Sequence, residues 1–125
     1  MHGPSRTEKP VRVLVVDDYQ PMADALSAML NGCGHDARAA YNGSEALRIA
    51  ADFRPQAIIS DVNMPKMNGF ELAEAVAERF PDCRLLLMSV QDFHRFPEVL
   101  ARPMKILTKP VRLTDVLEFL DTCLR

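Results

Sequence analysis

Residues 11–18 read Val-Arg-Val-Leu-Val-Val-Asp-Asp, a short apolar run that ends in two carboxylates. The run is rich in β-branched residues and almost wholly apolar, which is typical of a strand buried on both faces of a sheet. Such strands belong to parallel sheets whose two faces are covered by helices. This stretch therefore predicts an α/β fold with polar groups at the end of a strand.

Strand-like and helix-like segments alternate through the rest of the chain. Apolar residues recur with helical spacing between Met22 and Leu30, which predicts the first helix. Further strands are expected at 35–40, 56–60, 85–88 and 105–108, with helices at 45–51, 70–80 and 113–120. The segment 90–103 contains Pro97 and Pro103, so we expect a short or irregular fourth helix there.

Five strand–helix units in succession predict one doubly wound domain. Strands that alternate with helices form a parallel sheet with right-handed crossovers, and helices then cover both faces in a three-layer sandwich. We expect a five-stranded sheet of order 2-1-3-4-5. Residues 1–10 contain Gly3, Pro4 and Ser5 and are expected to form a flexible leader, so that residues 11–125 form the domain.

Composition excludes several classes of protein. The net charge is −2, with 15 basic residues scattered among 17 acidic ones, which argues against direct binding of nucleic acid or a membrane surface. No apolar run approaches the ~20 residues of a membrane span, and the first residues lack the apolar stretch of a secretory signal. The three cysteines lack the spacing of a zinc site and are expected to be reduced, which indicates the cytoplasm.

Polar residues follow four of the expected strands. Asp17 and Asp18 follow the first strand, Asp61 the third, Ser89 the fourth and Lys109 the fifth. Parallel strands bring their carboxyl ends to one edge, where ligands of open α/β sheets bind. We therefore expect three carboxylates, a hydroxyl and an ammonium group to converge there.

This set of groups favours phosphoryl transfer. Three clustered carboxylates repel one another unless a cation offsets their charge, and Mg²⁺ prefers oxygen ligands of this kind. Lys109 would add a positive charge and Ser89 a hydrogen-bond donor. A nucleophilic carboxylate with such neighbours suits a reaction that depends on positioning and charge stabilisation. No Gly-rich loop follows the first strand, so nucleotide binding of the Rossmann type is not expected.

Five motifs in order resemble bacterial two-component response-regulator receiver domains, the CheY-like family. They are VLVVDD (13–18), NGSEAL (42–47), DVNMPKMNGFEL (61–72), LLMS (86–89) and TKP (108–110), and the resemblance covers about residues 11–124. Each motif alone is moderately specific, but their order and spacing together are strongly specific. The resemblance implies a flavodoxin-like (βα)5 fold.

The resemblance also implies a metal site. Asp17 and Asp18 match the acidic pair that organises Mg²⁺, and Asp61 matches the aspartate that accepts the phosphoryl group. Asn63 matches the position whose backbone carbonyl is a further metal ligand. No organic cofactor is expected.

Two further residues match groups that handle the phosphoryl group. Ser89 matches the hydroxyl residue that moves toward it, and Lys109 matches the lysine that binds it. The peptide bond before Pro110 is expected to be cis, as is usual in the family. The phosphodonor would be a histidine kinase or a histidine phosphotransfer protein, and some family members also use acetyl phosphate.

The expected function is thus a signalling domain that catalyses its own phosphorylation and dephosphorylation and passes a conformational change to a protein partner. The chain ends just after the last expected helix, so no output domain is expected to follow. A homodimer is left open. Ile106 stands where many receivers have Tyr or Phe, and Val90 where Ala or Gly is common.

Two alternatives remain beside this reading. Ile106 and Val90 favour a phosphorylation-independent interaction module of the same fold, whereas the complete acidic set disfavours it. A metal-dependent phosphohydrolase acting on external substrates would need a substrate pocket, for which short loops leave little room.

Overall fold

The computed structural model describes residues 7–91 and 104–123 of the chain. The strands are β1 (Arg12–Val16), β2 (Asp36–Ala40), β3 (Ala57–Asp61), β4 (Arg84–Ser89) and β5 (Lys105–Thr108). The helices are α1 (Gln20–Gly32), α2 (Gly43–Phe53), α3 (Gly69–Arg79) and α4 (Leu113–Thr122). Strands and helices lie where the sequence predicts them, to within a few residues at each end.

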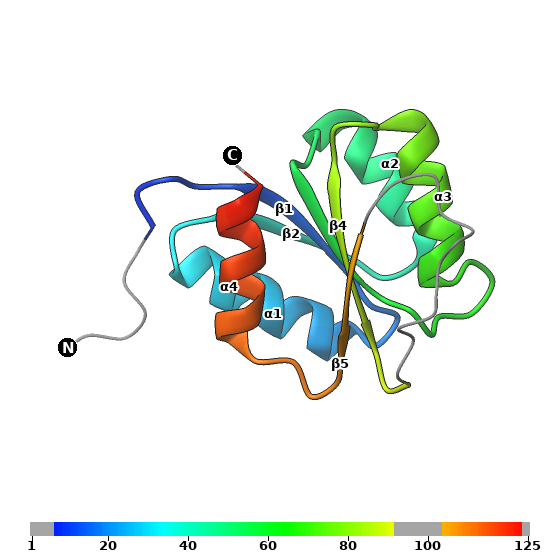
Figure 1. The fold of residues 1–125 in the computed structure, drawn as a ribbon. Helices are drawn as coiled ribbons and strands as arrows, with labels where there is room; N and C mark the ends of the chain where they lie inside the picture. The colour runs from blue at the N-terminus through cyan, green and yellow to red at the C-terminus, as the bar shows by residue number, and fades with distance from the viewer. Residues whose placement is uncertain (1–6, 92–103, 124–125) are drawn as a thin grey trace.

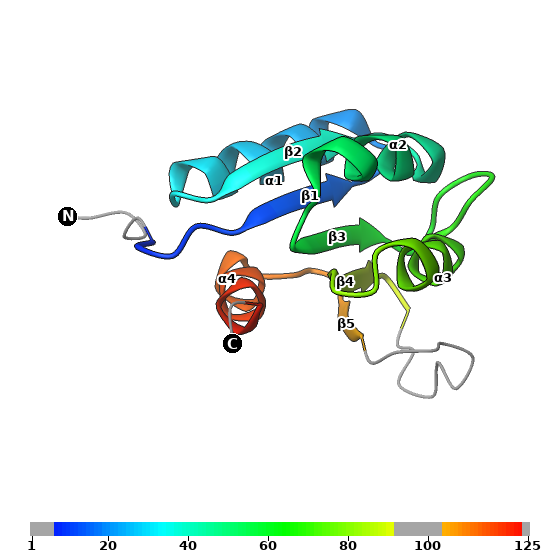
Figure 2. The ribbon, with the colours of Figure 1, turned by 90° about the horizontal axis from the view of Figure 1, so that it is seen from above.

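The five strands form one parallel sheet of order β2-β1-β3-β4-β5, which confirms the predicted order. Helices α1 and α4 cover one face, and α2 and α3 cover the other (Figures 1 and 2). Val16 at the end of β1 lies opposite Ser60 of β3, so these central strands end at the same level. This register places the residues that follow them side by side.

Strand β1 is buried on both faces, as its apolar sequence predicts. Val13 and Val15 pack in the core under α1 and α4, whereas Leu14 and Val16 pack in the core under α2 and α3. All four side chains are at most 1% exposed. Burial of a Val or Leu side chain stabilises the fold by ~1.5–3 kcal/mol. The central strands therefore form a rigid platform for the residues at their ends.

The helices on the second face begin at asparagine caps. The side chain of Asn42 accepts a hydrogen bond from the Glu45 backbone N–H at 2.8 Å. Asn68 and Glu71 form a reciprocal capping box, with bonds of 2.9 and 3.0 Å. These bonds satisfy backbone N–H groups that a helix start leaves without partners. The second cap also fixes the point at which the chain enters α3 after the strand that carries Asp61.

The predicted short or irregular helix within 90–103 falls almost entirely on residues 92–103, outside the described residues. The helix expected at 113–120 is α4. Among residues 7–91 and 104–123, no helix is long and apolar enough to cross a membrane. Cys33 and Cys83 are buried free thiols, and Cys123 is a partly buried one.

Candidate functional site

The predicted site residues lie at the carboxyl edge of the sheet. Asp17 directly follows β1, and Asp61 is the last residue of the neighbouring strand β3. Ser89 is the last residue of β4, and Lys109 directly follows β5. Because all four strands are parallel, the topology brings these groups to one edge, as expected.

Three carboxylates form a cluster at this edge. Oxygens of Asp17, Asp18 and Asp61 all lie within 4.8 Å of one another. Asp17 and Asp61 are buried, at 4% and 8% exposure, whereas Asp18 is exposed. Like charges this close destabilise one another, and burial adds to the cost of keeping them ionised. The negative charge of the cluster therefore favours the binding of a cation.

The pKa of Asp17 reflects the cost of keeping these carboxylates ionised. Burial raises the pKa of the Asp17 carboxyl, and the charges of Asp61 and Asp18 push it in the same direction. A hydrogen bond of 3.0 Å from the Tyr19 backbone N–H to Asp17 Oδ1 opposes the shift, as does the charge of Lys109. The raised pKa means that desolvation and repulsion outweigh these stabilising contacts.

Lys109 supplies the positive charge of the site. Its Nζ lies 2.9 Å from Asp61 Oδ1, a charge-assisted hydrogen bond at its usual length. Its backbone N–H donates to the Ser89 carbonyl at 2.7 Å, which ties the residue to the end of β4. The Lys109–Pro110 peptide bond is cis, as expected. The lysine thus contacts the residue that the sequence predicts to accept the phosphoryl group.

Ser89 is fully buried and lies one residue beyond Met88, which pairs with Asp61. Its Oγ accepts a hydrogen bond of 3.0 Å from the Gln91 backbone N–H. A hydroxyl has one proton to donate and two lone pairs, so this contact leaves the proton free. Ser89 can therefore donate a hydrogen bond to another oxygen while its contact with Gln91 persists.

Asn63 lies in the loop that follows Asp61, with an exposed side chain. The ends of this loop are held by backbone hydrogen bonds from Val62 N–H to the Met88 carbonyl at 2.9 Å and from Gly69 N–H to the Val62 carbonyl at 2.8 Å. The predicted role of Asn63 as a backbone metal ligand stays a prediction.

The sequence reasoning missed Ser60, which precedes Asp61 and is fully buried. Its Oγ donates a hydrogen bond of 2.9 Å to the Asp61 carbonyl oxygen. The available signal was a single hydroxyl at the end of the otherwise apolar run Ala57-Ile-Ile59. This contact is the only side-chain hydrogen bond given to the Asp61 backbone among the described residues.

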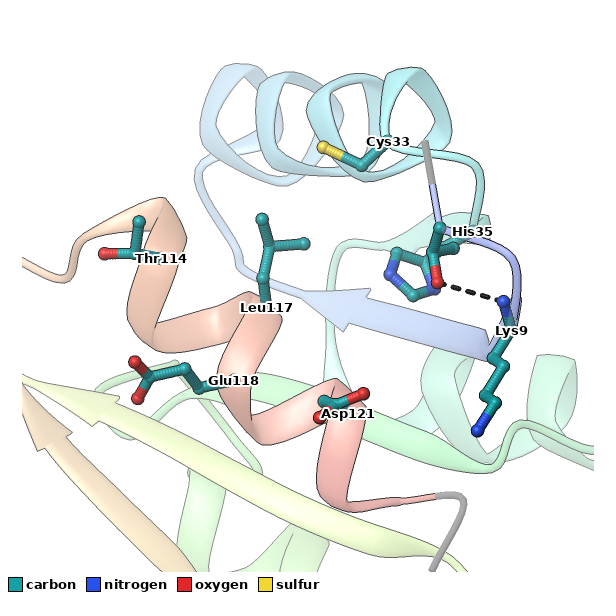
Figure 3. Close-up of a pocket in the computed structure, with 8 residues that line it drawn as sticks. Lys9, Cys33, His35, Thr114, Leu117, Glu118 and Asp121 are labelled. Carbon is teal, nitrogen blue, oxygen red and sulfur yellow. Dashed lines mark hydrogen bonds between the residues drawn. The ribbon is translucent and has the colours of Figure 1, made fainter. Parts of the chain in front are cut away.

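Two of the hollows in the described part of the chain lie on the side of the sheet that α1 and α4 cover. One, of about 570 Å³, lies between α1 and the start of α4, and Asp17 and Lys109 form part of its wall. The other, of about 400 Å³, lies between Lys9, His35 and neighbouring residues on one side and α4 on the other (Figure 3). This second hollow includes none of the predicted site residues.

Comparisons with known proteins agree with this geometry. The model of the response regulator receiver domain family matches residues 13–121. Response regulator MprA from Mycobacterium sp. (strain KMS) is 32% identical over 118 residues, which cover 93% of this chain and 51% of that protein. The chain thus spans about half the length of the curated relatives it matches.

Solved structures share the fold. Chemotaxis response regulator CheY4 of Vibrio cholerae is 29% identical with a TM-score of 0.80, over 92% of this chain and 99% of that one. Response regulator TrrA from Thermotoga maritima has a TM-score of 0.78 at 24% identity, over 90% of this chain and 98% of that one, and this likeness concerns the fold alone. The chain therefore belongs to the response regulator receiver domain family, the signalling domains of two-component systems.

Proposed function

We propose that this receiver is a switch that accepts a phosphoryl group on Asp61 from a histidine kinase or a histidine phosphotransfer protein. The observation that carries the proposal is the site geometry. The Asp61 carboxylate lies within a cluster of three acids spanning at most 4.8 Å, and Lys109 Nζ lies 2.9 Å from it. A nucleophilic carboxylate beside a fixed cation is the arrangement that phosphoryl transfer requires.

The residues at the site fit Mg²⁺. Oxygens of Asp17, Asp18 and Asp61, with the backbone carbonyl of Asn63, would supply the hard oxygen ligands that this ion prefers. Burial, together with the charges of Asp61 and Asp18, raises the pKa of Asp17 although Lys109 opposes the shift, so a bound cation would offset a cost that Lys109 alone does not. Bound Mg²⁺ would neutralise charge on the phosphoryl oxygens during transfer.

In the proposed reaction, a carboxylate oxygen of Asp61 attacks phosphorus in line with the phosphorus–nitrogen bond of a phosphohistidine. That bond breaks, and its electron pair leaves with the imidazole nitrogen. Lys109 Nζ exchanges its contact with Asp61 Oδ1 for a contact with a phosphoryl oxygen. The Ser89 hydroxyl donates a hydrogen bond to another phosphoryl oxygen. Attack of water on phosphorus, with the same groups in place, breaks the bond to the Asp61 oxygen, releases inorganic phosphate and returns the unmodified receiver.

The signal would leave the site through Ser89. Movement of its hydroxyl toward the phosphoryl group would pull on the Lys109 N–H to Ser89 carbonyl bond and on the Gln91 contact. Both contacts connect the site to β5 and to the segment after β4. Ile106, opposite Leu87, stands where many receivers have Tyr or Phe, and it has no aromatic ring that could turn inward. In our proposal these backbone hydrogen bonds transmit the change in place of such a ring. A protein partner would bind the surface altered by this conformational change.

The proposal also covers the compartment in which the protein works and the bounds of the receiver domain. The free thiols of Cys33, Cys83 and Cys123 fit a reducing compartment, which supports the cytoplasm. We propose residues 11–125 as the receiver and 1–10 as its leader. Thr7 donates a backbone hydrogen bond of 2.7 Å to the Cys33 carbonyl, so the end of this leader contacts the domain.

The test is intact-mass spectrometry after incubation with acetyl phosphate, with and without Mg²⁺. We expect the parent protein to gain one phosphoryl group in the presence of Mg²⁺ and none in EDTA. Asp61→Asn should gain none, and Asp52→Asn, which changes an exposed aspartate of α2, should behave like the parent. A gain retained by Asp61→Asn would refute the assignment.

If acetyl phosphate modifies nothing, a phosphorylated histidine kinase is tried next as the donor. Transfer from the kinase would support the switch and show that the donor must dock. Failure with both donors would favour a phosphorylation-independent interaction module of the same fold.

A further inference from the structure

Ser60 is a polar side chain buried in an apolar layer. It is 0% exposed and lies between Val16 of β1 and Leu87 of β4, which are also fully buried. Ile58, the preceding residue on the same face of β3, belongs to the core under α2 and α3. A buried hydroxyl costs free energy unless it forms a hydrogen bond. The partner of this hydroxyl therefore decides what Ser60 contributes.

The partner is the backbone of the acceptor residue. Ser60 Oγ lies 2.9 Å from the Asp61 carbonyl oxygen and 4.0 Å from Met64 Sδ. A hydroxyl has only one proton, and a thioether sulfur at 4.0 Å is a weak acceptor. The proton therefore goes to the Asp61 carbonyl, which fixes the orientation of the peptide unit that follows the acceptor.

Gly69 contacts the same carbonyl. A Cβ added at Gly69 would lie 2.6 Å from the Asp61 carbonyl oxygen and 2.8 Å from Val62 Cα. The start of α3 thus packs closely against this peptide unit, while the Ser60 hydroxyl holds its oxygen. Rotation of the peptide would move the Asp61 Cα–Cβ bond, and with it the carboxylate that faces Asp17 and Lys109.

We propose that Ser60 is a positioning residue for phosphoryl acceptance, because its hydroxyl holds the Asp61 carbonyl and thereby fixes the direction of the Asp61 carboxylate. The inference rests on the proposed function of Asp61 and deepens it. Ser60 does not touch the phosphoryl group, since its side chain lies on the face of β3 opposite the carboxylate. Its effect is on the geometry of attack.

The test compares three variants of this chain with the parent. Ser60→Ala removes the hydroxyl, and Ser60→Cys replaces it with a slightly larger thiol that is a weaker donor. Ser27→Ala is the matched control, because Ser27 Oγ is a buried hydroxyl of α1 with no hydrogen-bond partner among the described residues. The measurement is the rate constant and amplitude of phosphorylation at saturating Mg²⁺ and acetyl phosphate, with unfolding by urea measured in parallel.

The rate constant separates positioning from stability. Loss of stability lowers the amplitude, because fewer molecules are folded, but leaves the rate constant of the folded molecules unchanged. We expect Ser60→Ala to lower the rate constant about three- to tenfold and Ser60→Cys to lower it less, as small displacements of reacting groups slow reactions. Ser27→Ala should keep the parent rate constant.

Equal rate constants for the parent, both Ser60 variants and Ser27→Ala would overturn the inference and leave the proposed function intact. A parent protein that accepts no phosphoryl group from acetyl phosphate or a kinase would overturn both. If Ser60→Ala does not fold, Ser60→Cys decides the question, because its thiol fills the site and keeps one proton to donate. A Ser60→Cys rate constant equal to that of the parent would then count against positioning.

Discussion

Replacement of Gly69 by alanine should damage both stability and phosphorylation. The added Cβ would meet two backbone atoms, the Asp61 carbonyl oxygen at 2.6 Å and Val62 Cα at 2.8 Å. Carbon atoms pack comfortably at about 3.5–4.0 Å, so the backbone around the acceptor must move by about 1 Å. Backbone atoms cannot turn aside as a flexible side chain can. The strain therefore falls on the peptide that carries Asp61.

The expected magnitude follows from these contacts. Overpacking of a filled site costs about 1–3 kcal/mol, and alanine recovers up to about 1 kcal/mol of this through its greater helix propensity at the start of α3. The net loss of unfolding free energy should therefore lie between about 0 and 3 kcal/mol, with a middle value of about 1.5 kcal/mol. A shift of about 1 Å at a reacting group can slow a reaction by up to about 10²-fold, so we expect phosphorylation to slow at least tenfold.

The assay is urea unfolding together with the acetyl phosphate rate, with Gly32→Ala as the control. Gly32 ends α1, and a Cβ there would meet no heavy atom within 4 Å. This control should gain up to about 1 kcal/mol and phosphorylate at the parent rate. A Gly69→Ala variant as stable and as reactive as Gly32→Ala would refute the argument that Gly69 packs against the acceptor.

Three other changes should have distinct effects. Burial lowers the pKa of His35 from its ordinary value of 6.5. The free energy of unfolding should therefore be constant above pH 6.5 and fall below it, because the unfolded chain takes up the proton first. His35→Asn can still accept the hydrogen bond from Val11 N–H and should weaken this fall, as measured by urea unfolding at a series of pH values. Asp17→Asn relieves repulsion in the cluster and should raise the free energy of unfolding without metal by about 1 kcal/mol. It should also reduce the rise in Tm on addition of Mg²⁺, and a rise larger than that of the parent would contradict the metal assignment. Asn68→Ala breaks the capping box with Glu71 and should cost about 1 kcal/mol in urea unfolding, so an unchanged midpoint would speak against the cap.

The fold was predictable because its signals are local. The apolar run at Val13–Val16, the helical spacing after it and the proline and glycine breaks specify each element from a few neighbouring residues. The convergence of Asp17 and Asp61 also followed, because parallel strands must end at one edge. The segment around Pro97 gave no such signal beyond its prolines, and residues 92–103 lie outside the described part of the chain.

Side-chain partners across the fold were not predictable, because they depend on register and packing. His35 begins the strand expected at 35–40, and its Nδ1 accepts a hydrogen bond from Val11 N–H, 24 residues away, at 3.0 Å. Met67 packs against Gly43, where a Cβ would lie 2.5 Å from the Met67 sulfur. Ser60 faces the core on the opposite side from the acid cluster. The sequence does not show which of its few polar strand residues have such partners.

The most direct test of the central claim is to locate the phosphoryl group. The protein is phosphorylated with acetyl phosphate and Mg²⁺, or with a kinase if the small donor fails, and then treated with borohydride, which reduces an aspartyl phosphate to homoserine. Peptide sequencing by mass spectrometry identifies the reduced residue. Our account predicts homoserine at position 61 and nowhere else, and reduction at Asp17, Asp18 or any other acid, with Asp61 intact, would contradict it.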